Sequence, residues 1–139
     1  MDKATDTELI DRCLEFTAEK FGDLHPPVLE KYHDRLPGAK AELERHDNSG
    51  ELEHSMVEQA LYCLMTWFVR PLEVQIVLRD TVPHHIQTLD VPLRYLKELM
   101  NALIDVVEEA VPLTAEAERT TLYKLRKELQ LTLQEAVAP

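Results

Sequence analysis

A histidine pair precedes a proline-initiated amphipathic helix in the stretch Pro83-His84-His85-Ile86-Gln87-Thr88-Leu89-Asp90-Val91-Pro92-Leu93-Arg94-Tyr95-Leu96. After Pro92 the apolar side chains recur at intervals of three and four residues, the spacing that places them on one face of an α-helix. The members of this face are Leu93, Leu96, Leu99, Met100, Leu103, Ile104 and Val107. Charged and amide side chains occupy the opposite face, so we expect one side of this helix to be buried in a core.

The same periodicity extends over the rest of the chain. Only three glycines and eight prolines occur among 139 residues, and the apolar pattern follows the helical period rather than the alternation of strands. We expect helices over 5–21, 26–36, 51–68, 92–111 and 114–137, a short helical piece ending near 43, and a short helix, or else an isolated strand, over 72–78. Thr5 and Thr114 are the expected N-caps of the first and last helices. The sequence therefore predicts one all-α domain over 1–139 with six to seven helices.

The net negative charge of the chain restricts the classes of partner that it can bind. The formal net charge of −11 opposes binding to nucleic acid or to an anionic membrane, and no apolar run approaches the roughly 18 residues of a membrane span. Cys13 and Cys63 lie on apolar stripes and no secretory signal begins the chain, so we expect two buried thiols in a cytoplasmic protein. Neither a glycine-rich phosphate loop nor a Ser-His-Asp arrangement is visible, and we do not expect an enzyme.

The order of the helices and the segment around His85 resemble the globins, especially the bacterial single-domain globins and the globin domain of flavohaemoglobins. In that family an apolar-polar-proline turn follows the iron-binding histidine, and the next helix carries an aromatic; here His85 lies seven residues before Pro92 and ten before Tyr95. The resemblance implies a globin-like fold around a central pocket, with haem b bound through His85. His84 is the alternative ligand, and in a purely structural interpretation both histidines occupy the first turn of a short helix after Pro83.

The resemblance also implies a function. Haem in such a pocket would bind a diatomic gas, O2, NO or CO, for sensing, storage or protection against NO. The iron needs a neutral imidazole nitrogen, while a carbonyl group holds the other ring nitrogen and fixes the tautomer. We expect no reductase domain, so any redox cycle would need an outside electron donor.

Four apolar residues and one aromatic are the remaining haem contacts that the resemblance implies: Leu29, Leu43, Leu52, Met56 and Tyr95. Leu43 and Leu29 occupy the positions where haem globins often carry a phenylalanine and a tyrosine, and Leu52 occupies the position of the distal gate. No side chain there would hydrogen-bond a bound oxygen, which favours NO or CO. A shift of one residue in the alignment would instead bring Tyr32 or His54 to the distal side.

The missing distal aromatics leave open a second interpretation, a haemless globin-fold module that acts through protein contacts as a homodimer. The apolar stripes over 92–111 and 114–137 are long and paired, which favours an interface through these last two helices. Leu129 is expected to lie either in the core or in that interface. A pocket of several hundred Å3 beside His85 would favour haem, whereas a pocket filled by side chains would favour the haemless module.

Two Glu-x-x-His pairs suggest a different class of site, Glu30 with His33 and Glu51 with His54. In di-iron helix bundles such pairs project inward from two helices. Glu51 and His54 lie opposite the apolar stripe of their helix, and the helix that carries Glu30 is short and ends at Pro37. We therefore expect these pairs to arise by chance in a chain rich in glutamate.

Overall fold

The computed structural model describes residues 4–46 and 49–137, and this part of the chain contains seven α-helices and no strand. The helices are α1 (Asp6–Phe21), α2 (His25–Arg35), α3 (Pro37–His46), α4 (Glu51–Thr66), α5 (Pro71–Gln87), α6 (Leu93–Ala110) and α7 (Glu116–Glu135). The expected all-α, globin-like architecture is confirmed. None of the helices in the described ranges is long and apolar enough to cross a membrane.

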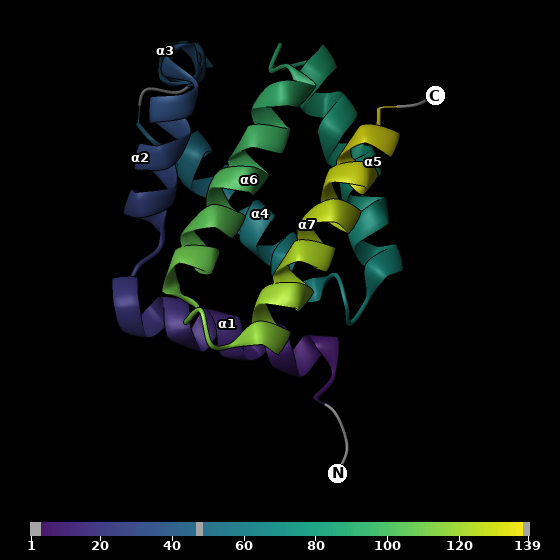
Figure 1. Ribbon diagram of the computed structural model, residues 1–139. Helices are drawn as coiled ribbons and strands as arrows, with labels where there is room; N and C mark the ends of the chain where they lie inside the picture. The colour runs from purple at the N-terminus through teal and green to yellow at the C-terminus, as the bar shows by residue number, and fades with distance from the viewer. Residues whose placement is uncertain (1–3, 47–48, 138–139) are drawn as a thin grey trace.

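Helix α6 is the central element. It packs against α1, α2, α4, α5 and α7, and Figure 1 shows it between α2 and α7, with α1 crossing one end of the helices. Its apolar face is buried: Leu103, Ile104 and Val107 are completely enclosed, while Leu93 and Leu96 at its start are partly buried against the core. The amphipathic pattern after Pro92 therefore predicts the burial of this helix correctly.

Local sequence signals explain where most helices begin and end. The Thr5 hydroxyl accepts a hydrogen bond from the backbone N–H of Glu8 at 3.1 Å, which confirms the expected cap of α1. Gly22 ends α1 with a φ of 69°, a conformation that glycine adopts without steric cost. The expected cap at Thr114 is wrong, because a turn in which the Ala115 N–H bonds the Pro112 carbonyl moves the N-cap of α7 to Ala115.

Helix α5 is longer than the sequence pattern predicts. It runs for 17 residues and passes through Pro83, so His84 and His85 lie in its last turn. The interpretation in which they occupy the first turn of a new helix after Pro83 is therefore wrong. Pro83 has no N–H to donate to the carbonyl of Arg79, and the helix continues past this missing bond because its inward face is packed.

The buried apolar residues form one cluster to which all seven helices contribute. In α7 the expected inward residues Leu122, Leu125 and Leu129 are buried, Leu129 completely. Val137 lies beyond the end of the helix and is 42% exposed, contrary to the expectation that it faces inward. The apolar stripes of the last two helices are thus used within one chain.

Helix α1 is held against α7 by polar contacts as well as by the core. The Asp6 carboxylate accepts hydrogen bonds from the Thr121 hydroxyl at 3.2 Å and from the Lys124 ammonium at 2.9 Å. Arg12 lies 3.8 Å from Glu118, one helical turn further along the same interface. Polar side-chain contacts therefore attach α1 to α7 in addition to their shared core packing.

Candidate functional site

His85 has the local geometry of an oriented metal ligand. Its side chain is buried in the last turn of α5, and its Nδ1 lies 2.8 Å from the carbonyl oxygen of Thr81. A carbonyl can only accept, so Nδ1 carries the proton and Nε2 is the nitrogen available to a ligand. The Val91 N–H donates to the His85 carbonyl at 2.8 Å and fixes the turn that follows. This is the imidazole arrangement that an axial haem ligand requires.

The space beside His85 does not fit haem. The cavity that it lines has a volume of about 40 Å3, whereas pockets that enclose organic ligands usually measure about 300 to 1,000 Å3. Side chains from α4, α5, α6 and α7 fill the remainder, among them Met56, Cys63, Leu78, Leu99, Met100 and Leu133. The nitrogen donor is therefore suitable, but the described side chains leave room for a few water-sized atoms and none for a porphyrin.

The expected haem contacts do not come together around this cavity. Met56 lines it with His85, but the other four residues are not among its lining side chains. Leu43 is fully buried in α3, and Leu29 and Leu52 pack against the edge of the core. The hydroxyl of Tyr95 lies beside Gly38, at the start of α3.

Tyr32, which a shift of one residue in the globin alignment would bring to the distal side, is a buried polar residue. It lies in α2 with no exposed surface, and its hydroxyl has no hydrogen-bond partner among the described residues. Burial, followed by the proximity of Tyr95, raises the pKa of Tyr32 above its usual value. Tyr32 does not line the cavity beside His85, so it has no ligand to contact there.

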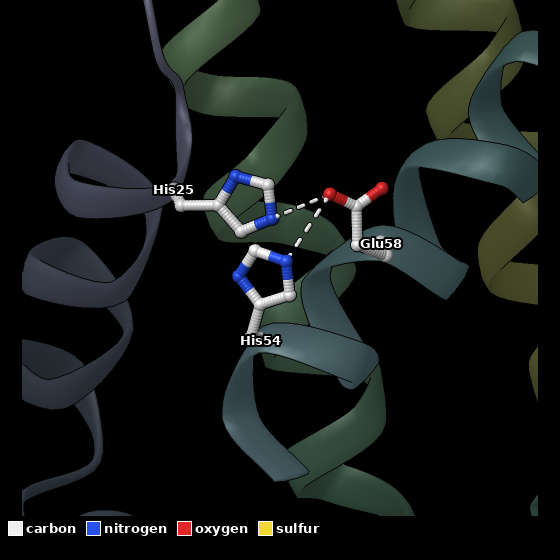
Figure 2. Close-up of side chains that lie close together, drawn as sticks. All are labelled: His25, His54 and Glu58. Carbon is white, nitrogen blue, oxygen red and sulfur yellow. Dashed lines mark ion pairs between the residues drawn. The ribbon is translucent and has the colours of Figure 1, made fainter. Parts of the chain in front are cut away.

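The structure brings together a different group, His25, His54 and Glu58, which the sequence analysis did not identify (Figure 2). The Glu58 Oε1 lies 3.0 Å from Nε2 of His25 and 3.6 Å from Nε2 of His54. The two imidazole rings are stacked, with their centroids 4.2 Å apart and an interplanar angle of 10°. Three potential metal-ligand atoms from α2 and α4 thus lie within 4.8 Å of one another.

Asp23 orients the ring of His25. The carboxylate oxygen Oδ1 accepts a hydrogen bond from the backbone N–H of His25 at 3.0 Å and lies 2.8 Å from its Nδ1. These two contacts, the backbone one foremost, hold the pKa of Asp23 below its usual value. Nδ1 therefore faces a carboxylate, and Nε2 faces Glu58.

The Glu-x-x-His pairs do not form a di-iron centre. His33 lies 3.3 Å from Glu53 instead of pairing with Glu30, and His54 pairs with Glu58 instead of Glu51. Both Glu30 and Glu51 are exposed. The expectation that these pairs arise by chance agrees with their positions, and the informative spacing on α4 is the four-residue interval from His54 to Glu58.

Several exposed apolar side chains belong to the second half of α4, the turn after it and the start of α5. The α4–α5 corner surface consists of Tyr62, Met65, Val69, Leu72 and Ile76, all of which are exposed. A hydrogen bond with the Glu73 carboxylate raises the pKa of Tyr62, and Arg70 bonds the same carboxylate at 2.6 Å. These contacts join the outer face of α4 to the start of α5 across the turn.

No family model, curated protein or solved structure matches this chain. The globin family therefore remains a prediction from the sequence, and the function has to be inferred from the residues themselves.

Proposed function

We propose that the chain is a haemless globin-like module that acts through protein contacts and associates with a second copy of itself. The observation that carries this proposal is the cavity of about 40 Å3 beside His85, because a haem-dependent function needs a pocket several times larger. The cytoplasmic location and the bacterial type of this protein remain predictions from its sequence.

The apolar stripes of the last two helices are a poor interface because the core already buries them. Leu103 and Leu129, which lie on the stripes that suggested this interface, are fully buried within one chain. On α6, Asp105 pairs with Arg35 of α2 and with Arg126 of α7, each at 2.6 Å. A partner at this face would have to displace a satisfied set of ion pairs.

The α4–α5 corner surface is the better candidate. Large apolar side chains there remain in water, and burying them stabilises a complex by roughly 25 cal/mol per Å2. A dimer with two-fold symmetry uses the same patch on both chains, so one apolar surface is sufficient. Its core would be formed by Leu72 and Ile76, which lie one helical turn apart on α5 and are both exposed.

A matched pair of variants tests the interface. Ile76→Glu places a charge on the corner surface, and Leu131→Glu places the same charge on α7 at a similar exposure, 61% against 58%. We expect wild type and Leu131→Glu to be dimers by light scattering, and Ile76→Glu to be a folded monomer. A monomeric wild-type protein, or a dimer that only Leu131→Glu disrupts, would contradict the proposal.

Haem ligation by His85, with O2, NO or CO as the gas, is the second candidate function. It is favoured by the contact of Nδ1 with the Thr81 carbonyl, which leaves Nε2 for iron. Binding would require Met56 and Met100 to move out of the cavity that they line. Haemin titration tests it: a Soret band that survives gel filtration and is lost in His85→Ala would favour haem, and a colourless protein would exclude it.

A further inference from the structure

We propose that His25, His54 and Glu58 bind a divalent transition metal, and that Zn2+ is the ion to which these ligands are best suited. Two imidazole nitrogens and one carboxylate oxygen form a ligand set that zinc uses when it keeps a fourth position for water. Figure 2 shows both Nε2 atoms directed toward the Glu58 carboxylate. This inference is independent of the proposed self-association.

The contact between His25 and Glu58 needs a positive charge. Because Nδ1 of His25 faces the Asp23 carboxylate at 2.8 Å, a neutral ring carries its proton there and directs the lone pair of Nε2 outward. That nitrogen is inaccessible to solvent and has no hydrogen bond of good geometry to any described residue, although Glu58 Oε1 lies 3.0 Å away. Two electron-rich atoms at this distance repel each other unless a proton or a metal ion lies between them.

The fold holds the ligands in position from two elements. His25 is the first residue of α2, and Pro26 and Pro27 restrict the backbone that follows it. His54 and Glu58 lie one turn apart on α4, so their side chains share a face. Ligand atoms around zinc lie about 3.3 Å apart, whereas these three atoms lie within 4.8 Å of one another. Binding therefore requires the side chains to move closer, and His54, which is 63% exposed, has solvent around it for that movement.

Asp23 is a positioning residue for this site. Metal-bound histidines usually donate their second ring N–H to a carboxylate, which fixes the ring and increases its basicity. The contact between Asp23 and Nδ1 of His25 supplies this interaction before any metal is bound. The net charge of −11 also favours the approach of a cation.

Calorimetric titration of the chelator-treated full chain with zinc chloride tests the site. We expect one Zn2+ per chain, and at least about a ten-fold loss of affinity in His54→Ala and in Glu58→Gln. The matched control is His84→Ala, which removes an exposed histidine of α5 and leaves the affinity unchanged. Asp23→Asn weakens binding by about ten-fold without changing the stoichiometry.

Cobalt(II) provides a second readout, because tetrahedral coordination gives visible absorption bands that His54→Ala should abolish. A wild-type protein that binds no zinc, or a loss in His84→Ala equal to that in His54→Ala, would overturn the proposal and leave the cluster as a protonated ion pair. Circular dichroism of each variant shows that the fold is retained. Light scattering in the presence and absence of zinc measures the oligomeric state separately, so failure of the zinc site can be distinguished from failure of the proposed self-association.

Discussion

Arg35 of α2 and Asp105 of α6 lie 2.6 Å apart, and Arg126 of α7 approaches the other oxygen of the same carboxylate at the same distance. One acidic side chain on the central helix therefore connects it to helices on both sides. Burial alone would raise the pKa of Asp105, but the hydrogen bonds from the two arginines outweigh it and hold the pKa below its usual value.

Asp105→Asn should lower the free energy of unfolding by about 1 kcal/mol at pH 7, a figure reduced for solvent screening because the arginines are partly exposed. A pKa that is lowered on folding adds stability above the unfolded value of about 3.9 and loses it as the pH falls. The difference between wild type and variant should therefore shrink below pH 4 in urea titrations. Asp80→Asn, at an exposed position on α5, is the control; an equal effect there would refute the role of Asp105.

Tyr32→Phe should stabilise the protein or leave its stability unchanged. The variant removes a fully buried hydroxyl that has no hydrogen-bond partner among the described residues, and such a group costs about 1 to 3 kcal/mol in lost hydration. Urea unfolding measures the change, with Tyr123→Phe at an exposed position as the control. A clear loss of stability in Tyr32→Phe alone would mean that the hydroxyl has a bound partner.

Neither thiol should react in the folded protein. Burial raises the pKa of Cys63 to about 12, and burial followed by Glu118 raises the pKa of Cys13 to about 12. Ellman's reagent at pH 8 should detect no thiol until denaturant is added, when it should detect two. Above pH 9 the unfolded chain releases these protons and the folded chain retains them, so stability should fall as the pH rises. Rapid reaction in native buffer would contradict the burial of these residues.

Leu129→Ala should lower the free energy of unfolding by about 2 to 5 kcal/mol, because it leaves a cavity in the core between α7 and its neighbours. Leu131→Ala, two residues along the same helix and 58% exposed, should change it by no more than about 0.5 kcal/mol. Leu129→Glu should unfold the chain rather than produce a folded monomer. Similar stabilities for Leu129→Ala and Leu131→Ala would show that α7 is rotated from its described position.

Zinc should raise the melting temperature, since a metal held by α2 and α4 stabilises only the folded chain. At 100 times its dissociation constant, a ligand adds about 2.7 kcal/mol. EDTA should reverse the shift, and His54→Ala should not show it. A shift of the same size in His54→Ala would place the metal elsewhere.

Sequence periodicity predicts most of the fold, because α6 and α7 each bury one continuous apolar face. It fails where tertiary packing outweighs a local signal. Pro83 normally ends or bends a helix, yet α5 continues to Gln87 because Val82 and His85 remain packed inward. Thr114 is a suitable cap by composition, but the turn after Pro112 shifts the start of the helix.

The candidate site is predicted less well than the fold. The segment around His85 correctly singles out a histidine whose ring is oriented by a hydrogen bond. The volume of the cavity beside His85 depends on how four helices pack together, and a local sequence pattern carries no information about that packing. The cluster of His25, His54 and Glu58 joins residues from two helices. Its only sequence signal is the interval from His54 to Glu58, and that interval is common in chains rich in charge.

Because α1 packs against α7, α1 cannot complete its native contacts on the ribosome until α7 has been synthesised. The inward face of α1, which includes Ile10 and Cys13, is covered mainly by α6 and α7. Both helices follow α1 in the chain, so α1 leaves the ribosome with its apolar face unprotected until α6 and α7 have been synthesised. Nascent chains that stop before Glu116 should therefore bind chaperones and resist compaction, and the native core should form only after the last helix has emerged.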